Sequence, residues 1–478
     1  MGDALHLTLR WVAEAVGGDL RGGDPQREIG NVVIDTRVLK PGDFFVALRG
    51  ARYDAYEFVA EAFEKGASGA IVERGRTVSG GSSDAAPVRV PSMGQDLIEV
   101  TDTTAALQGL ARAVRRASGT RVVAITGSAG KTTTKEAVAE LLSRRFRVAR
   151  NKGNLNNHIG LPLSLLQLRD RPDVAVMELG MNHEGEISTL VAIAEPETRV
   201  WTNVGDAHIG FFHSADAIAD AKAEILERAG SDHLLVCNAD DPRIMARVGR
   251  FAGRTVTFGT SSGATVRAVD VEALGVDGMR ARVVTPAGEH QIHTPLVGRG
   301  NLSNLLAATA VALEFGASLH EIATTVSNLK AADRRGMVTR LRDGVVLIDD
   351  SYNSSPKALA RALETIASDG RAVRKVAVIG EMLELGTHAL DLHQEAGRLA
   401  AVSGLGLMFA VGGAPARALA EAAIEVGMPA SAVQYVEKSE LAADQVAEAI
   451  RPGDLVLVKG SRGTRTDIVA DRIATVFG

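Results

Sequence analysis

The chain has 478 residues, 46% of them hydrophobic and 23% charged, which is typical of a globular protein of roughly two to four domains. The formal net charge of −5 gives no polybasic character, so we expect no nucleic-acid partner. The single cysteine, Cys237, excludes an intrachain disulfide, which fits a reducing cytoplasm. No apolar run approaches the ~20 residues that a membrane helix needs, and residues 1–6 lack the pattern of a secretory signal.

The first hundred residues alternate short apolar segments. We expect helices at 9–16 and 56–63, the first closed by Gly17 and Gly18, and strands at 32–37, 44–48 and 70–72. The glycine- and serine-rich segment 80–84 is typical of a surface loop. These features predict a small α/β domain over residues 1–99.

Two further α/β domains follow. Between residues 100 and 329 strands alternate with helices, which predicts a mainly parallel sheet, with an antiparallel β extension at about 256–297. From residue 330 to 478 the alternation restarts, with expected strands at 345–350, 376–380, 408–412 and 455–460, the last three with glycine at their ends. That pattern predicts a doubly wound, Rossmann-like sheet.

The central feature of the sequence is the stretch 125–134, Ile-Thr-Gly-Ser-Ala-Gly-Lys-Thr-Thr-Thr. An apolar run precedes it and an amphipathic helical pattern follows it, the arrangement of a phosphate-binding loop. Backbone N–H groups of the loop and the helix N-terminus attract phosphate; Lys131 reaches the outer phosphates, and the Thr132 hydroxyl suits magnesium. Ile125 stands where the usual P-loop has its first glycine, so a glycine turn that binds nothing is the alternative.

Strand ends supply further candidates. Glu178 ends one apolar run, and His208 follows the run 199–204; a carboxylate and an imidazole beside a nucleotide suit a magnesium shell. The alternatives are an N-cap or surface ion pair for Glu178 and a capped core histidine for His208. On pattern alone Lys222 is an ordinary solvated lysine on a helix.

Two polar clusters complete the candidates. Asn301 and Asn304 share one helix face, so their amides suit an adenine edge, or Asn301 simply caps the helix. The stretch 349–356, Asp-Asp-Ser-Tyr-Asn-Ser-Ser-Pro, gathers polar groups in a strand-to-helix turn, which suits either a site or a capping turn.

These motifs resemble those of the Mur ligases of peptidoglycan synthesis over essentially the whole chain. The matching segments are the short P-loop 127–133 and the stretches 156–162, 178–183, 202–208, 301–304, 349–353, 380–386 and 459–462. Segments 349–353 and 380–386 are most similar to the MurF group, which adds D-alanyl-D-alanine to UDP-N-acetylmuramoyl-tripeptide. The Asp-Asn-Pro-Arg signature of the related MurE group is absent.

The resemblance implies an ATP-dependent amide ligase that works through an acyl phosphate, with Mg²⁺ as cofactor. Its implied partners are UDP-MurNAc-tripeptide and D-Ala-D-Ala, and we expect a cytoplasmic monomer without a membrane segment. The three domains would bind the UDP-muramyl substrate (1–99), bind ATP (100–329) and form the Rossmann-like lobe (330–478). Because Arg335 and Asp350 lie in a different domain from Lys131, we expect the last domain to close over ATP.

The resemblance also implies roles for individual residues. Catalytic roles fall to Lys131, Glu178, His208 and Lys222, and Lys222 matches a lysine that family members carbamylate. The implied metal ligands are Thr132, Glu178, His208 and Lys222. ATP would contact Gly127, Ser128, Ala129, Gly130, Lys131, Thr132, Thr133, Asn304, Arg335 and Asp350. The other substrates would contact Thr36, Arg37, Asp43, Arg49, Asn156, Asn157, Tyr352, Asn353 and Lys459.

Three departures from the family pattern concern the loop and the two ends of the chain. Ala129 replaces the usual Asn or Ser, residues 52–58 replace an Asp-Gly-His-x-Phe segment, and Thr466-Asp467 replaces a Met-Glu pair. Two alternatives stay open: another Mur-type ligase such as MurE, and a P-loop protein that binds nucleotide without ligation. Segment 349–353 argues against the first, and Lys131, Glu178 and His208 argue against the second.

Overall fold

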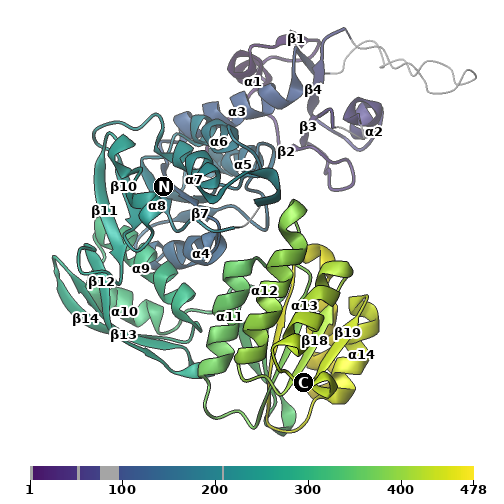
Figure 1. Cartoon of the computed structure of the whole chain (residues 1–478). Helices are drawn as coiled ribbons and strands as arrows, with labels where there is room; N and C mark the ends of the chain where they lie inside the picture. Colours follow the sequence, from purple (N-terminus) through teal and green to yellow (C-terminus); the bar gives the residue numbers. More distant parts are fainter. Residues whose placement is uncertain (1–3, 51–53, 76–95, 207–208) are drawn as a thin grey trace, which may run out of the picture. The chain divides into compact units, whose positions relative to one another are not determined.

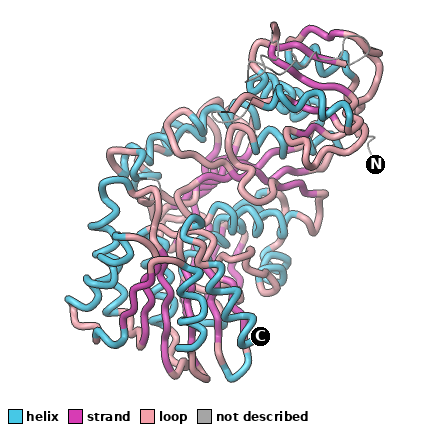
Figure 2. The backbone as a smooth tube through the Cα atoms, turned by 90° about the vertical axis from the view of Figure 1, so that its right-hand side faces the viewer, coloured by secondary structure: helices cyan, strands magenta, loops and turns pink. Residues whose placement is uncertain are grey.

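The computed structural model describes residues 4–50, 54–75, 96–206 and 209–478 (Figure 1). Helices and strands alternate along the chain (Figure 2), as the sequence predicts. The chain divides into two compact units, one of Met1–Ala124, Phe146–Gly180 and Glu186–Glu197, the other of Ile125–Arg145, Met181–Gly185 and Thr198–Gly478. The predicted domain boundaries at 99/100 and 329/330 stay predictions, and the loop predicted at 80–84 lies outside the described residues. Among the described helices, none combines the length and the apolar character needed to cross a bilayer.

The N-terminal sheet has the strand order β1-β5-β4-β3-β2 and is parallel except for β1. Its strands are β1 (Asp19–Arg21), β2 (Val32–Val33), β3 (Phe44–Val46), β4 (Gly69–Glu73) and β5 (Leu97–Val100), with helices α1 (Leu9–Val16) and α2 (Val59–Glu64). Helix α1 ends at Gly17, in the left-handed conformation, as expected. The strand expected at 32–37 is shorter, because the Asp35 carboxylate accepts the N–H of Arg37 and turns the chain.

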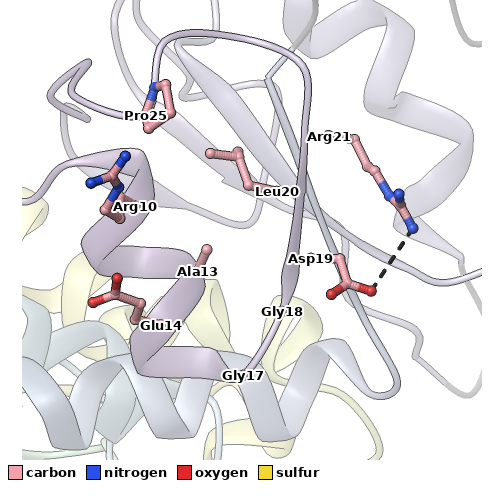
Figure 3. A pocket seen from close by; sticks show the side chains of 9 residues that line it. All are labelled: Arg10, Ala13, Glu14, Gly17, Gly18, Asp19, Leu20, Arg21 and Pro25. Atoms are coloured by element: carbon pink, nitrogen blue, oxygen red, sulfur yellow. Dashed lines mark ion pairs between the residues drawn. The ribbon is translucent and has the colours of Figure 1, made fainter.

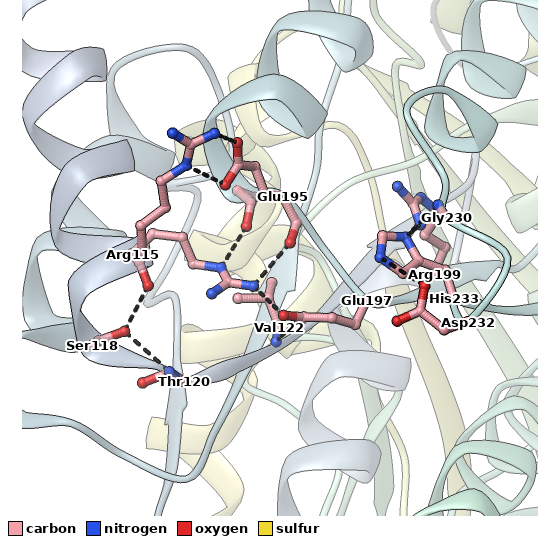
Figure 4. Close-up of polar contacts among 12 residues, drawn as sticks. Arg115, Ser118, Thr120, Val122, Glu195, Glu197, Arg199, Gly230, Asp232 and His233 are labelled. Atoms are coloured by element: carbon pink, nitrogen blue, oxygen red, sulfur yellow. Dashed lines mark hydrogen bonds and ion pairs between the residues drawn. The ribbon is translucent and has the colours of Figure 1, made fainter.

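The rest of the first unit carries helices α3 (Thr103–Ser118), α5 (Gly160–Leu165) and α6 (Glu186–Ala194), and the parallel strands β7 (Val148–Arg150) and β8 (Val174–Glu178). Strand β6 (Arg121–Thr126) runs from this unit into the second. A buried guanidinium fixes the start of β6 (Figure 4). Arg115 donates to the carbonyl oxygens of Ala194 (2.8 Å) and Glu195 (2.9 Å) and pairs with Glu197, whose carboxylate accepts the N–H of Val122 at 2.7 Å.

The middle part of the second unit has the strand order β14-β13-β12-β11-β10-β9. The strands are β9 (Thr198–Trp201), β10 (Leu234–Asn238), β11 (Arg254–Gly259), β12 (Val266–Ala273), β13 (Met279–Thr285) and β14 (Gly288–Thr294). The helices are α4 (Lys131–Leu142), α7 (Ala215–Ala223), α8 (Pro242–Met245), α9 (Arg299–Glu314) and α10 (Leu319–Val326). The predicted antiparallel extension is right for β12 to β14 and wrong for β11, which pairs parallel with both neighbours.

The C-terminal region, residues 330–478, forms a sheet with the order β15-β16-β20-β17-β18-β19, in which only β15 is antiparallel. Its elements are β15 (Met337–Arg340), β16 (Val346–Asp350), α11 (Pro356–Ser368), β17 (Arg374–Gly380), α12 (Ala389–Val402), β18 (Leu407–Val411), α13 (Ala414–Glu425), β19 (Val433–Val436), α14 (Ser439–Ala449), β20 (Asp454–Lys459) and α15 (Asp467–Phe477). Figure 1 shows α11, α12 and α13 side by side. One core cluster joins these helices to the sheet and a second joins α14 and α15 to it, so the predicted doubly wound architecture is confirmed.

A short turn between β12 and β13, which we call the anchor turn (Gly275–Asp277), joins this middle part to the C-terminal region. Val276 belongs to the same core cluster as Leu363 and Ile366 of α11. The buried Asp369 carboxylate accepts the N–H groups of Val276, Arg371 and Ala372, and Asp277 pairs with Arg340 and Arg371, each at 2.5 Å. Apolar burial and a converging set of hydrogen bonds therefore fix this contact.

We expect Asp369→Ala to lower the free energy of unfolding by about 1–3 kcal/mol, because it leaves buried N–H groups without an acceptor. Burial opposes ionisation of Asp369, but the hydrogen bonds from Arg371, Val276 and Ala372 outweigh it and lower its pKa. Because the pKa of Asp369 is lower in the folded protein, its carboxylate stabilises the fold at pH values above the unfolded-state pKa, about 3.9. That stabilisation is lost as the pH falls through the folded-state pKa. Thermal unfolding from pH 7 to pH 3 checks this, with the exposed Glu364→Ala as control. Equal melting temperatures for Asp369→Ala and wild type at pH 7 would contradict the assignment.

Candidate functional site

The glycine-rich loop between β6 and α4 permits no side chain at either glycine. A Cβ atom on Gly127 would lie 2.0 Å from the Thr202 hydroxyl oxygen. A Cβ atom on Gly130, where φ is +78°, would lie 2.2 Å from the Asn304 amide oxygen. Gly130 precedes α4, and no side chain caps that helix N-terminus, so its partial positive charge faces the loop. The helix N-terminus that the sequence predicts behind this loop is present.

Residues 202–205, which directly follow β9, hold this loop in place, and we call them the brace. The carboxamide of Asn203 binds both backbone groups of one loop residue: its oxygen accepts the N–H of Ala129 and its nitrogen donates to the Ala129 carbonyl, each at 2.9 Å. The N–H of Ser128 donates to the Asn203 carbonyl at 3.0 Å, and the N–H of Gly205 donates to the Ser128 hydroxyl at 2.8 Å. Two of the loop amides predicted to hold phosphate, those of Ser128 and Ala129, thus donate to Asn203 instead. The positive N-terminus of α4 is then the main feature of the loop that attracts phosphate.

Lys131, at the start of α4, and Lys222, on α7, lie close enough for their charges to interact. The Lys131 ammonium donates to the Gly127 carbonyl at 2.9 Å. Lys222 on α7 is only 2% exposed, so the interpretation of it as a solvated helical lysine is wrong. Burial and the positive charge of Lys131 hold its pKa well below the usual range, and Glu224 opposes this. A buried, neutral amine is the form that reacts with carbon dioxide.

Glu178, at the end of β8, is buried and held by amide side chains. Its carboxylate accepts a hydrogen bond from the Asn156 amide at 2.8 Å, and Asn151 binds both its N–H and its carbonyl. Burial distinguishes Glu178 from a surface ion pair. Asn157 instead caps α5, accepting the N–H groups of Ile159 and Gly160.

Not all of the metal ligands predicted from the sequence lie among the described residues. His208 lies outside the described residues, so its predicted role stays a prediction. Within the parts of the chain that the structure describes, no three His, Cys, Asp or Glu side chains are grouped so as to hold a metal ion.

The C-terminal region brings several predicted residues together where β16 and β20 end. The Lys459 ammonium donates to the Asp350 carboxylate at 2.5 Å and to the Asn353 carbonyl at 3.0 Å. The guanidinium of Arg335 lies 4.0 Å from the centre of the Tyr352 ring, and that of Arg462 lies 5.4 Å from it. Asn304 does not join this group and lies against Gly130 instead.

The predicted UDP-binding residues have local roles in the first unit. Arg37 donates to Asp35 and lowers the pKa of that carboxyl to about 2. The Thr36 carbonyl accepts from Lys65, the buried Asp43 carboxylate accepts the N–H of Lys40, and Arg49 forms a β-bridge with Asp54. A groove of about 530 Å³ lies between α1 and β1 (Figure 3), lined by Arg10, Glu14, Asp19 and Arg21 among others, and it contains none of the predicted substrate residues.

A second pocket, of about 360 Å³, lies directly beside the glycine-rich loop. Ser128, Ala129 and Asn203 line one side of it, and the cationic side chains of Arg299, Lys357 and Arg361 line another. Its acidic side chains are already engaged: Asp240 accepts the N–H groups of Thr260 and Ser261, and Asp241 accepts those of Val204 and Arg243. The balance of available charge is positive, which suits an anionic ligand next to the loop.

Comparisons with known proteins agree with this arrangement. The family model "Mur ligase middle domain" matches residues 125–312, and "Mur ligase, glutamate ligase domain" matches residues 334–462. The UDP-N-acetylmuramoyl-tripeptide–D-alanyl-D-alanine ligase of Bacillus subtilis is 34% identical over 473 residues, 98% of this chain and 99% of the relative. The chain belongs to the Mur ligase family.

Solved structures place it in the MurF group of that family. MurF from Acinetobacter baumannii superposes with a TM-score of 0.87 at 30% identity, over 99% of this chain and all of the relative. MurF from Thermotoga maritima, solved in complex with ADP, gives a TM-score of 0.80 at 28% identity, over 93% of this chain and 97% of the relative. The predicted three-domain fold class of this Mur ligase is confirmed.

Sequence reasoning missed three residues of this Mur ligase site. Asn203 lies near the end of the expected strand 199–204 and is not among the candidates, although its carboxamide braces the loop. Lys357 reaches the brace from α11, donating to the Val204 carbonyl at 3.2 Å. Glu224, two residues after Lys222, accepts the N–H of Gly185 at 2.7 Å. Only the position of Asn203 at a strand end gave a signal in the sequence.

We expect Gly130→Ala to weaken ATP binding by at least about tenfold, equivalent to about 1.4 kcal/mol. The new methyl group requires a left-handed conformation for alanine and collides with Asn304. Calorimetric titration with ADP measures the effect. Gly263→Ala is the matched control, since a Cβ there meets nothing within 4 Å. Normal affinity in Gly130→Ala would mean that ATP binds elsewhere.

Proposed function

We propose that the chain is an ATP-dependent ligase that joins D-alanyl-D-alanine to UDP-N-acetylmuramoyl-tripeptide in peptidoglycan synthesis. The products are UDP-MurNAc-pentapeptide, ADP and phosphate. The observation that carries the proposal is the braced glycine-rich loop, with Lys131 at the start of α4, in a chain that matches ligases of this name along its whole length.

The chemistry follows from positioning and charge. An oxygen of the tripeptide's terminal carboxylate attacks the γ-phosphorus of ATP, ADP leaves, and an acyl phosphate forms. The amine of D-Ala-D-Ala then attacks the acyl carbon, the C–O bond to phosphate breaks, and the amine loses a proton as the amide forms. Lys131 and the N-terminus of α4 attract the phosphates and offset the negative charge that builds up during transfer.

We assign the cofactor site from the chemistry of its donors. The Thr132 hydroxyl, the Glu178 carboxylate and a carbamylated Lys222 offer oxygen atoms, which Mg²⁺ prefers, and His208 is a less usual ligand. Bound Mg²⁺ would neutralise phosphate charge. Lys222 fits carbamylation because burial and then the positive charge of Lys131 lower the pKa of its amine, which favours the neutral form that reacts with carbon dioxide.

The remaining assignments come from the family resemblance. We assign Asn304, Arg335 and Asp350 to ATP, together with loop residues 127–133. We assign Thr36, Arg37, Asp43, Arg49, Asn156, Asn157, Tyr352, Asn353 and Lys459 to the other substrates. The clustering of Arg335, Asp350, Tyr352 and Lys459 supports a shared site in the C-terminal region. We also propose that the chain acts as a cytoplasmic monomer with domains at 1–99, 100–329 and 330–478.

The proposed reaction predicts that phosphate release from ATP requires both UDP-MurNAc-tripeptide and D-Ala-D-Ala. A coupled phosphate assay with each substrate omitted in turn measures this. Lys131→Met should lower kcat at least about a hundredfold, because the charge beside the transferred phosphate is lost. Lys375→Met is the matched control, since Lys375 donates only to Ala367 within the C-terminal region. Release that ignores the dipeptide would favour an ATPase, and release with a single amino acid instead would favour a MurE-like ligase.

The proposed carbamate on Lys222 predicts one ¹³C resonance in the carbamate region after incubation with ¹³C-bicarbonate. Only a neutral amine reacts with carbon dioxide, so burial of this lysine favours the adduct at neutral pH. Nuclear magnetic resonance of wild type and Lys222→Gln distinguishes this site from other lysines. A resonance that persists in Lys222→Gln, or none in wild type, would exclude the modification.

A further inference from the structure

The segment that braces the loop is held by the C-terminal region at two points. Lys357, on α11, donates from its ammonium nitrogen to the Val204 carbonyl at 3.2 Å. Farther along, the N–H of Gly210 donates to the Glu384 carbonyl at 3.0 Å. Residues 207–208, between these points, lie outside the described residues.

We propose that Lys357 and the contact of Gly210 with Glu384 and Gly386 are positioning elements that transmit the docking of the C-terminal region to the glycine-rich loop. The proposal rests on the ligase function above and names residues that the function itself does not require. The glycine-rich loop then takes its ATP-binding geometry only when the C-terminal region holds the brace.

Lys357 acts on the residue of the brace that lies between two loop contacts. Val204 is preceded by Asn203, which binds Ala129, and followed by Gly205, whose N–H binds the Ser128 hydroxyl. The N–H of Val204 donates to Asp241 at 2.8 Å while its carbonyl accepts from Lys357, so both backbone groups of this residue are held. A displacement of Val204 therefore moves the partners of both Ser128 and Ala129.

The start of α11 orients Lys357 for this role. Ser355 is the N-cap of the helix and Pro356 is its first residue, where proline fixes φ in a helical value. The Lys357 side chain runs along the brace: its Cδ atom would lie 3.3 Å from a Cβ placed on Gly205. Lys357 thus belongs to the C-terminal region by chain connection and contacts the brace.

The second contact is made by backbone alone. A Cβ on Gly210 would lie 2.6 Å from the Gly386 nitrogen, and one on Gly386 would lie 2.9 Å from the Gly210 Cα atom. Glu384 has φ +65°, a conformation that non-glycine residues adopt only when their surroundings impose it. Ile209, next to Gly210, packs against the core cluster of the C-terminal region. Together these features indicate a specific contact that no larger residue can make.

The test measures the loop directly, in the full chain without nucleotide. We expect Lys357→Met to raise hydrogen exchange in peptides that cover residues 125–134 by at least about fivefold, since the amides of Ser128 and Ala129 lose their fixed acceptors. Lys357→Arg, which keeps a donor, should restore protection. Lys375→Met, another lysine that donates to a backbone carbonyl, is the control and should leave exchange unchanged. Unchanged exchange in Lys357→Met, or an equal rise in Lys375→Met, would overturn the proposal.

Kinetics provide the second readout. Lys357→Met and Gly386→Ala should each lower kcat/KM for ATP about tenfold, and the double variant should lose little more than the worse single variant, because both loosen the same docking of the C-terminal region. Losses that multiply would overturn the shared path, as would a Lys357→Met that alters KM for ATP while leaving exchange unchanged, which means direct contact with the ligand. If wild type has no ligase activity, the proposed function fails, and the exchange measurements still decide whether the brace couples to the loop.

Discussion

The site depends on a hydrogen-bonded pairing between two segments far apart in the sequence, the glycine-rich loop and the brace. A loop that must present backbone to phosphate cannot pack through side chains, because glycine has none. The fold instead fixes the loop through polar groups. The Asn203 carboxamide binds the N–H and the carbonyl of Ala129, and Ser128 exchanges hydrogen bonds with Gly205. Because these groups are satisfied before any ligand arrives, the loop pays little ordering entropy on binding.

Hydrogen bonds also fix strand β6, which precedes the loop. Its start is fixed at Val122 by Glu197, which Arg115 holds in turn, and its end is fixed where the N–H of Thr202 donates to the Thr126 carbonyl. Beyond the brace, the anchor turn and the contacts of Lys357 and Gly210 join the middle part of the second unit to the C-terminal region. Most of these links are backbone groups or charged side chains that accept and donate in fixed directions, so they define orientation more than they add stability.

The sequence was sufficient for what depends on local pattern. The glycine-rich loop, the α1 helix with its terminal glycine and the doubly wound C-terminal sheet all follow from spacing and periodicity, and the structure confirms them. It was insufficient where a distant partner decides. Lys222 lies in α7, where Asp216 and Asp220 are exposed and Lys222 is on the buried side, and only packing against distant elements decides which side the lysine takes. Asn203 acts on residues 74 positions away. The roles of His208, Asn304 and the first-unit residues rest on resemblance and stay predictions.

The burial of Lys222 has a consequence for the electrostatics of the whole molecule. The formal count of 53 lysines and arginines against 58 acids, a net charge of −5, treats this side chain as a cation. Replacing that ammonium by a carbamate would change the formal net charge from −5 to −7. Exchange between ammonium and carbamate is therefore a reversal of sign at a single buried point, two elementary charges within a low-dielectric interior, where Coulomb interactions are strongest. Dissolved carbon dioxide would then change the net charge of this enzyme. Isoelectric focusing would separate the protein with the Lys222 carbamate from the protein without it.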